Sequence, residues 1–254
     1  MRTDPDTTTW TGLPIIADEV FTGLYRLGHK TSSGLIHLHP DISVHAKLLT
    51  GGLLPLSATL ASESIFEAFL ADGKEDALLH GHSYTANPVG CSVANTSLKL
   101  LRNLEEDGKW DPYKADWKTS RGLSSAVESV VGAVRNAGAK AMGTNHAFAG
   151  PTPQIWSVWS TAFISALSHA TDRVDGVWAL GSVLSITLHD KAGAGYTSNA
   201  AREMQQRLRT DVDGEGWNIH SRVLGNVVYL MASQISDVAN VRAWEGKVKE
   251  ALGL

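Results

Sequence analysis

A short apolar run that ends at two carboxylates constrains this chain more than any other feature. The run Pro14-Ile15-Ile16-Ala17 carries no charge and is followed directly by Asp18 and Glu19. This is the pattern of a buried parallel strand, and open α/β sheets hold their ligands at the C-terminal edge of such strands. We therefore predict a strand that delivers the Asp18 carboxylate to a ligand-binding edge. A turn or a helix cap is the alternative role for an aspartate at this position.

One lysine stands in a comparable setting further along the chain. Lys47 lies in the weakly polar segment 45–52, which ends in a double glycine. A lysine in such a segment is a candidate for Schiff-base chemistry. Pyridoxal phosphate requires an amine for its aldehyde and a carboxylate opposite its ring nitrogen, and Lys47 and Asp18 supply one of each. The alternative role for Lys47 is an ordinary solvated surface charge.

Composition excludes several classes of function. The 22 Lys and Arg residues against 26 Asp and Glu give a formal charge of -4, and no dense basic cluster marks a nucleic-acid binder. No apolar run reaches the roughly 18 residues that a membrane helix needs, so we expect neither nucleic acid nor a membrane as partner. Cys91 is the single cysteine, which excludes an internal disulfide and fits a reducing compartment.

The histidines do not indicate a metal site. Six of the ten lie between positions 29 and 82, but their spacing matches no ligand pattern such as His-Glu-x-x-His. We therefore expect no metal. The sequence also lacks the Gly-x-Ser-x-Gly nucleophile motif and the glycine-rich loops that bind nucleotides.

Apolar patterning predicts a mixed α/β chain. It indicates strands at 56–60, 177–188 and 226–231, and helices at 62–70, 88–104, 124–137, 156–167, 198–208 and 236–252. Residues 21–39 are predicted to be a loop, and the charged stretch 105–122 a linker. Trp156 and Trp159 are expected to anchor a core rather than to form a binding site.

Two further residues are candidates for ligand binding. Ser83 lies in a hydroxyl-rich loop just before Asn87-Pro88, which match the cap-then-proline start of a helix. An anion such as a phosphate would be well placed there, and simple capping by the hydroxyls is the alternative. Arg222 precedes the strand predicted at 226–231 and by itself is typical of a surface cation.

Three stretches, 18–28, 40–42 and 47–52, resemble the signature of the class III aminotransferases in content and spacing. Residues 53–60 and 79–91 are more specifically similar to one branch of that family, the eukaryotic 7,8-diaminopelargonic acid aminotransferases of biotin synthesis. The resemblance extends from about Leu13 to the C-terminus. It implies an α/β fold of the fold type I, aspartate-aminotransferase-like class.

The resemblance implies a cofactor role for three of the candidates. Lys47 would hold pyridoxal 5'-phosphate as a Schiff base and then transfer protons as general base and acid. Asp18 would keep the ring nitrogen protonated. Ser83 would bind the phosphate of the cofactor held by a partner subunit, which implies a homodimer with shared sites.

The resemblance also implies the substrates. The amino donor would be S-adenosylmethionine and the acceptor 8-amino-7-oxononanoate, with 7,8-diaminononanoate as product. Arg222 would hold the carboxylate of the acceptor, a task suited to a bidentate guanidinium, and Gly81 and His82 would belong to the same substrate site. Residues 232–234, Ala-Ser-Gln, depart from the Pro-Pro-Tyr of many relatives. Another class III ω-amino-acid aminotransferase is the alternative.

By resemblance, this chain is the C-terminal part of a longer enzyme, and an inactive fragment is the alternative reading. Residues 1–12 are expected to be a disordered lead-in, 13–122 part of the large cofactor-binding domain, 123–172 a helical insertion and 173–254 the small C-terminal domain. Some eukaryotic relatives carry a dethiobiotin synthetase module upstream. An intracellular location is expected, mitochondrial or cytoplasmic, and no targeting signal is found in the sequence.

Overall fold

The computed structural model of the chain consists of two compact units. Unit 1 is Met1–Asn103 with Glu128–Pro153, and unit 2 is Leu104–Val127 with Gln154–Leu254. The structure describes residues 14–77, 81, 83–119, 129, 132–133, 136, 153–190, 193, 195–210 and 218–254. The lead-in expected at 1–12 and most of the helix expected at 124–137 lie outside these residues.

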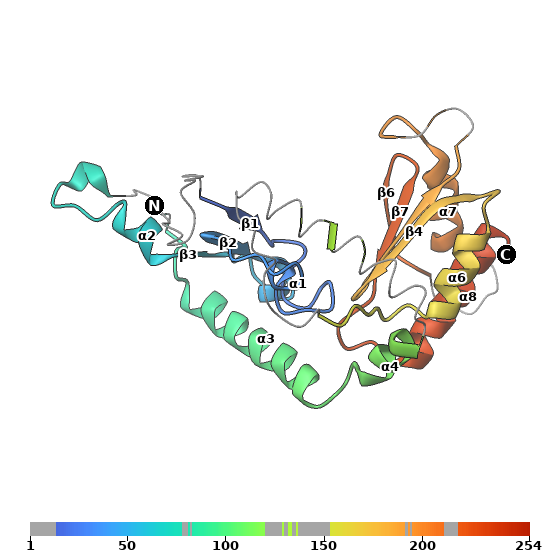
Figure 1. The fold of residues 1–254 in the computed structure, drawn as a ribbon, viewed down its shortest axis with the longest axis horizontal. Helices are drawn as coiled ribbons and strands as arrows, with labels where there is room; N and C mark the ends of the chain where they lie inside the picture. The colour runs from blue at the N-terminus through green and yellow to red at the C-terminus, as the bar shows by residue number, and fades with distance from the viewer. Residues whose placement is uncertain are drawn as a thin grey trace. The chain divides into compact units, whose positions relative to one another are not determined.

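Unit 1 contains a three-stranded sheet in the order β1-β2-β3 (Figure 1). The strands are β1 (Ile16–Asp18), β2 (Ile42–His45) and β3 (Ala58–Ala61). β1 and β2 are parallel, with Asp18 paired to Val44, and β3 runs antiparallel to β2. The predicted parallel strand ending at Asp18 is confirmed. Its predicted burial is wrong, because β1 is an edge strand of this sheet and Ile16 is 62% exposed.

The helical segments of unit 1 are short except for the last one. They are α1 (Ser32–Leu35), η1 (Lys47–Leu49), α2 (Glu63–Glu67), η2 (Lys74–Asp76) and α3 (Pro88–Glu106). α3 begins at the predicted proline, and Asn87 Oδ1 accepts the N–H groups of Val89 at 3.0 Å and Gly90 at 3.2 Å. Asn87 is therefore the N-cap of α3. α1 is a single turn inside the stretch that was predicted to be a loop.

Unit 2 contains a four-stranded antiparallel sheet in the order β4-β5-β7-β6. The strands are β4 (Val174–Leu180), β5 (Val183–Leu188), β6 (Arg222–Leu224) and β7 (Val227–Met231). The strand predicted at 177–188 is a hairpin, which turns at Gly181 with a φ of +54° that favours glycine. In β5 Leu184, Ile186 and Leu188 are buried and the residues between them are not, so one face of the sheet forms the core.

Three helices lie together on one side of this sheet (Figure 1). They are α6 (Thr161–His169), α7 (Ala200–Arg209) and α8 (Val238–Leu252), and the last two confirm the predictions for 198–208 and 236–252. Phe163, Leu167, Met204 and Val248 of these helices are at most 4% exposed. No helix in the described part of the chain is long and apolar enough to cross a membrane.

The prediction of a linker at 105–122 is wrong, because this stretch contains α4 (Asp111–Thr119). Trp110, Tyr113 and Trp117 follow one another at helical spacing and are each 1% exposed. Each side chain donates a hydrogen bond to a main-chain carbonyl: Trp110 Nε1 to Gln234 at 3.0 Å, the Tyr113 hydroxyl to Ser236 at 3.0 Å and Trp117 Nε1 to Trp159 at 2.9 Å. α4 is therefore part of the unit 2 core, together with Trp156 and Trp159, whose predicted core role is confirmed.

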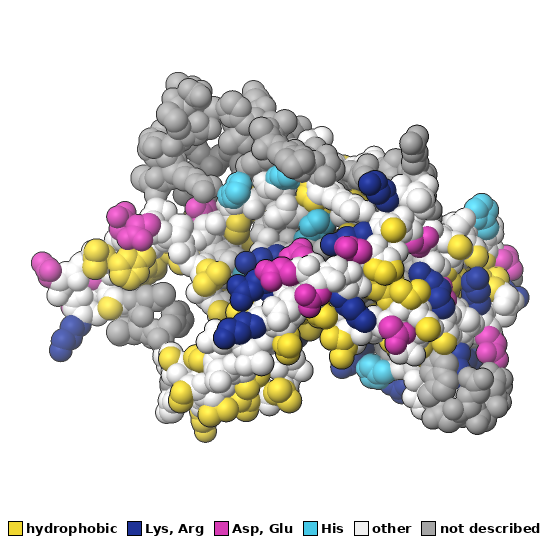
Figure 2. All heavy atoms as spheres, turned by 90° about the horizontal axis from the view of Figure 1, so that it is seen from below, with side chains coloured by type: hydrophobic (Ala, Val, Ile, Leu, Met, Phe, Trp, Pro, Cys, Tyr) yellow, Lys and Arg dark blue, Asp and Glu magenta, His cyan; other side chains and the backbone are white. Residues whose placement is uncertain are grey.

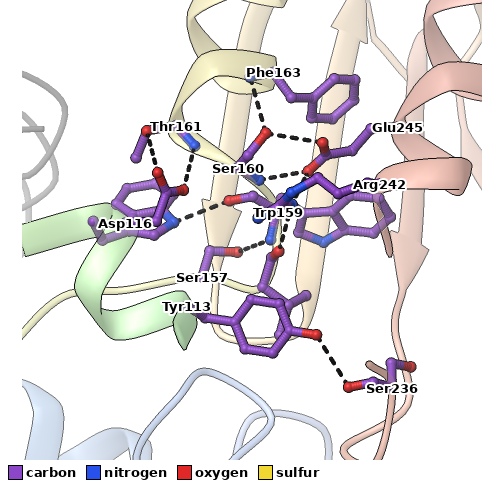
Figure 3. Close-up of polar contacts among 12 residues, drawn as sticks. Tyr113, Asp116, Ser157, Trp159, Ser160, Thr161, Phe163, Ser236, Arg242 and Glu245 are labelled. Atoms are coloured by element: carbon purple, nitrogen blue, oxygen red, sulfur yellow. Dashed lines mark hydrogen bonds and ion pairs between the residues drawn. The ribbon is translucent and has the colours of Figure 1, made fainter. Parts of the chain in front are cut away.

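Two carboxylates from other helices hold the N-terminus of α6 (Figure 3). Asp116 of α4 accepts the N–H and the hydroxyl of Thr161, both at 3.0 Å. Glu245 of α8 is 6% exposed and accepts the Ser160 N–H at 2.5 Å and the Ser160 hydroxyl at 2.8 Å. Arg242 lies 2.6 Å from Glu245 and balances its charge. This network joins α4, α6 and α8 within unit 2.

Candidate active site

Asp18 is the last residue of β1, and its side chain is exposed. Its Oδ1 accepts the N–H of Val20 at 3.0 Å, which fixes one oxygen of the carboxylate against the main chain. The N–H of Glu19 donates to the carbonyl of Val44 at 3.0 Å, so pairing with β2 continues one residue beyond Asp18. The carboxylate is thus held at the end of the strand and remains open to a ligand.

Lys47 is the first residue of η1 and is exposed. It follows Val44, the strand partner of Asp18, by three residues. Three residues of rise along a strand, combined at a right angle with one spacing between strands, correspond to a Cα separation of about 11 Å between Asp18 and Lys47. A lysine side chain, a pyridine ring and a carboxylate can span that distance. Because β1 and β2 are parallel, both residues lie at the same edge of the sheet.

Lys47 has a left-handed backbone conformation, with φ +50°. This conformation costs a residue with a side chain about 1 kcal/mol or more. The surroundings maintain it. The Thr50 N–H donates to the Lys47 carbonyl at 3.2 Å, the Thr50 hydroxyl to the Leu54 carbonyl at 2.7 Å, and the Ser97 hydroxyl of α3 to the Leu48 carbonyl at 2.7 Å. Three hydrogen bonds therefore fix the segment that presents the lysine.

Ser83 and Gly81 are exposed residues just before α3, and His82 lies outside the described residues. The predicted cap of this helix is Asn87 and not a hydroxyl of the loop. Because Asn87 already accepts the N–H groups of the first turn, these groups are not left for an anion. The hydroxyl of Ser83 therefore remains the candidate phosphate ligand of this segment.

Arg222 is the first residue of β6 in unit 2 and is exposed. It pairs with Tyr229 of β7, so the two side chains leave the same face of the sheet. In the unusual segment 232–234, Ala232 and Gln234 are buried and Ser233 is exposed. Ala232 is 2% exposed and Gln234 7% exposed, and Gln234 Nε2 donates to the Ser182 hydroxyl at 3.2 Å. The role of Arg222 toward a carboxylate stays a prediction.

Glu19 has no predicted role, yet its side chain is 2% exposed and bonded at the same sheet edge. Its carboxylate accepts hydrogen bonds from Ser32 and Ser33 at the start of α1. The only signal in the sequence is a second charged residue directly after a strand end. Its partners lie 13 and 14 residues away, beyond any local pattern.

Other groups of the described residues offer no second site of this kind. Among them, no three His, Cys, Asp or Glu side chains converge as a metal ion would require. Cys91 lies on α3, where it is partly buried. Asp18 and Lys47 therefore stay the predicted functional residues of unit 1.

A model of the family described as aminotransferase class-III matches residues 6–147, more than half of the 254 residues. The match includes Asp18, Lys47 and Ser83. The chain belongs to the class-III aminotransferase family. Members of this family depend on pyridoxal phosphate, so the family agrees with the lysine and carboxylate at the sheet edge.

Two relatives with known names are bifunctional proteins. A protein of Emericella nidulans, named bifunctional dethiobiotin synthetase/adenosylmethionine-8-amino-7-oxononanoate aminotransferase, is 51% identical over 96% of this chain and 27% of its own length. A bifunctional protein of Oryza sativa, named mitochondrial, is 38% identical over 86% of this chain and 21% of its own length. The chain thus spans about a quarter of the length of these relatives.

Solved structures confirm the predicted fold type I class. An amine transaminase from an uncultivated Pseudomonas species, solved with pyridoxal phosphate bound, matches with a TM-score of 0.64 at 20% identity over 95% of this chain and 45% of its own. An aminotransferase of Bacillus anthracis matches with a TM-score of 0.61 at 18% identity over 94% of this chain and 44% of its own. At these identities the likeness extends to the fold alone.

Proposed function

We propose that this chain carries the lysine-bearing part of an aminotransferase of biotin synthesis. The enzyme would transfer the amino group of S-adenosylmethionine to 8-amino-7-oxononanoate and release 7,8-diaminononanoate. The 51% identity to the Emericella protein of that name supports the choice of reaction. The observation that carries the proposal is the parallel pairing of β1 and β2, with Asp18 and Lys47 at one edge of the sheet.

The residues at this edge fit pyridoxal phosphate. When bound, the cofactor withdraws electrons from the carbon that loses or gains the amino group. Lys47 would hold the cofactor through its amine and would then move a proton to and from the donor carbon as general base and acid. Asp18 would face the protonated ring nitrogen, and the Ser83 hydroxyl would bind the phosphate of a cofactor held by a partner subunit.

Arg222 binds the carboxylate of 8-amino-7-oxononanoate in this proposal. A guanidinium offers a planar fork that matches a carboxylate at two points. Arg222 is exposed at the end of a strand, so its fork is accessible. Gly81 and His82 are the other residues that we propose for substrate binding, and a Cβ added at Gly81 would meet no atom of the described residues within 4 Å.

Covalent attachment at Lys47 tests the proposal directly. The purified chain is incubated with pyridoxal phosphate, reduced with borohydride and mapped by peptide mass spectrometry. We expect the reduced adduct on Lys47, no adduct at this position in Lys47→Ala, and weaker retention in Asp18→Asn. A chain that attaches the cofactor at several surface lysines equally would refute the site and favour an inactive fragment.

The identity of the amino donor separates this reaction from that of other class-III enzymes. Transamination is measured with S-adenosylmethionine, alanine or glutamate as donor. We expect turnover when S-adenosylmethionine is the amino donor and none when alanine or glutamate is the donor. Turnover with alanine or glutamate instead would assign the chain to another ω-amino-acid aminotransferase.

A second copy of the chain is the proposed partner of unit 1. Exposed apolar side chains gather on α3 and around α2 (Figure 2), and a patch of this kind marks a protein interface. They are Leu53, Leu60, Phe66, Phe69, Leu70, Val89, Leu98 and Leu100. A dimer in sedimentation analysis is the expected result, and a monomer at micromolar concentration would count against it.

The wider setting is proposed from the names of the relatives. The fungal and plant relatives are fused to dethiobiotin synthetase, so we propose that the same module acts together with this chain. The two plant relatives are named mitochondrial, which supports a mitochondrial location. Imaging of the tagged protein tests it, with a cytoplasmic signal as the contrary outcome.

A further inference from the structure

We infer that Glu19 is a positioning residue, which fixes the direction of the Asp18 carboxylate at the sheet edge. The inference rests on the proposed function for the identity of the group that Asp18 faces, namely the ring nitrogen of pyridoxal phosphate. Its structural part, that Glu19 orients Asp18, rests on the contacts of unit 1 alone.

Glu19 is bonded through its main chain and through both carboxylate oxygens. Its N–H donates to the Val44 carbonyl at 3.0 Å, which continues the pairing of β1 with β2. Oε2 accepts the Ser32 N–H at 3.0 Å, and Oε1 accepts the Ser33 N–H at 2.9 Å and the Ser33 hydroxyl at 2.5 Å. A buried carboxylate with three donors is held in one orientation.

The orientation of Glu19 determines that of its neighbour. Successive side chains at the end of a strand point to opposite sides. Because the Glu19 side chain is turned toward the start of α1, the Asp18 side chain is directed the other way, where it is exposed. The Val20 N–H then holds Asp18 Oδ1 at 3.0 Å. Asp18 therefore lies between two residues that restrict its direction.

Gly23 shows how closely the following loop packs on Glu19. The Gly23 N–H donates to the Glu19 carbonyl at 3.0 Å. A Cβ at position 23 would lie 2.9 Å from that carbonyl oxygen and 3.1 Å from Oε2 of Glu19. The hydroxyls of Thr22 and Ser32 lie 2.8 Å apart and join the loop to α1 a second time. Glu19 is thus enclosed by the strand, the loop and α1.

The direction of Asp18 matters for the proposed cofactor. A pyridine nitrogen stays protonated while a carboxylate accepts its N–H, and a hydrogen bond weakens steeply once its angle falls below about 120°. A rotated Asp18 would hold the cofactor less tightly and let the ring nitrogen lose its proton at lower pH. Glu19 acts on the chemistry through Asp18 and does not touch the cofactor itself.

Glu19→Gln tests the inference, with Asp41→Asn as the matched control. Both variants replace a carboxylate by an amide in unit 1. Asp41 Oδ2 accepts the Ile15 N–H at 2.9 Å, at the start of β1 and away from Asp18. Glutamine has one oxygen for donors that approach both oxygens of Glu19, whereas one oxygen of asparagine suffices at position 41.

Two measurements on these variants read the position of Asp18. The first is the affinity for pyridoxal phosphate and the pH titration of its absorbance. We expect both Glu19→Gln and Asp18→Asn to bind about tenfold more weakly than the wild type, and Asp41→Asn to match the wild type. The second needs no cofactor. It is the amide resonance of Val20 in a ¹H–¹⁵N spectrum, which Glu19→Gln should move in the direction that Asp18→Asn moves it.

Each outcome decides the inference. A Glu19→Gln protein whose Val20 resonance and cofactor titration both match the wild type overturns the positioning role. If the wild-type chain binds no pyridoxal phosphate, the proposed function fails and the Val20 resonance still decides the role of Glu19. Ser33→Ala removes only the hydroxyl donor and should give the same changes at smaller amplitude, so it serves where Glu19→Gln does not fold.

Discussion

The two units differ most in what they do with their apolar side chains. In unit 2 Trp110, Trp117 and Trp159 are each 1% exposed, inside a core that a sheet and helices share. In unit 1 Phe66 and Leu100 are each 60% exposed. Among the described residues the buried apolar side chains of unit 1 are Leu24, Tyr25, Leu35, Leu49, Ala94 and Leu101.

The large buried core therefore lies in one unit and the candidate site residues Asp18 and Lys47 in the other. Unit 2 buries the large side chains that stabilise a domain by itself, whereas unit 1 carries Asp18 at the end of the edge strand β1 and Lys47 just after the neighbouring strand β2. Exposed apolar patches of this kind mark surfaces that another protein surface covers. We therefore expect the stability of unit 1, but not that of unit 2, to depend on a partner.

The largest expected effect is that of Trp117→Ala in unit 2. Loss of a fully buried Trp and its hydrogen bond to Trp159 should lower the free energy of unfolding by about 3–5 kcal/mol. Trp178→Ala is the control, because Trp178 is 51% exposed, and it should cost less than about 1 kcal/mol. Urea unfolding followed by circular dichroism measures both, and equal losses would contradict the assignment of the core.

A second comparison uses adjacent leucines of α3 in unit 1. Leu101 is 6% exposed and Leu100 60% exposed. Leu101→Ala should lower the free energy of unfolding by about 2–4 kcal/mol, and Leu100→Ala by less than about 0.5 kcal/mol in the monomer. Leu100→Ala should instead weaken self-association in sedimentation analysis. A large loss of monomer stability from Leu100→Ala would mean that this face is already packed within one chain.

The polar network of unit 2 gives an intermediate effect. Glu245→Gln removes the charge that Ser160 and Arg242 face in a buried site and should lower the free energy of unfolding by about 1.5–3 kcal/mol. Glu203→Gln breaks an exposed pair with Arg207 and should change it by less than about 0.5 kcal/mol. Thermal unfolding of the two variants, measured together, gives the difference between these losses of stability. Equal losses would mean that the network around Glu245 is not formed.

The smallest of these effects concerns Tyr113 and depends on pH. Burial raises the pKa of the Tyr113 hydroxyl, while Arg242 opposes the rise and Asp237 and Glu245 add to it. The unfolded chain therefore loses this proton at lower pH than the folded one, so stability falls as pH rises through about 10. Tyr113→Phe should remove the loss of stability that Tyr113 ionisation causes above pH 10. At neutral pH it should lower the free energy of unfolding by about 1 kcal/mol, because the variant lacks the hydrogen bond to Ser236. Parallel slopes above pH 10 for both proteins would contradict the pKa shift.

Local signals in the sequence were sufficient for some elements and not for others. The strand ending at Asp18 and the start of α3 at Pro88 follow from neighbouring residues, and both are observed. α4 was missed because its charged residues resemble a linker, and the carbonyls that its aromatic side chains bind lie 42 to 124 residues away in the sequence.

The candidate site also has parts that local signals in the sequence predict and parts that they do not. The motifs that carry the family resemblance bring Asp18 and Lys47 into one prediction, and the parallel pairing of β1 and β2 puts both at one sheet edge. The contacts of Glu19 could not be predicted, because they require the loop 21–31 to return to the strand. The capping of α3 by Asn87 likewise decides which donors of that segment remain for a phosphate.

The left-handed backbone of Lys47 means that the residue best suited to folding stability at this position is not the one that carries an amine. Glycine adopts this conformation without steric penalty, so Lys47→Gly should be more stable than Lys47→Ala by about 1 kcal/mol, although both lack the amine. A polypeptide released from the need for an amine here would therefore gain by exchanging it for glycine. In the proposed function, the need for the Lys47 amine explains why a residue with a side chain is kept at a position where glycine would be more stable.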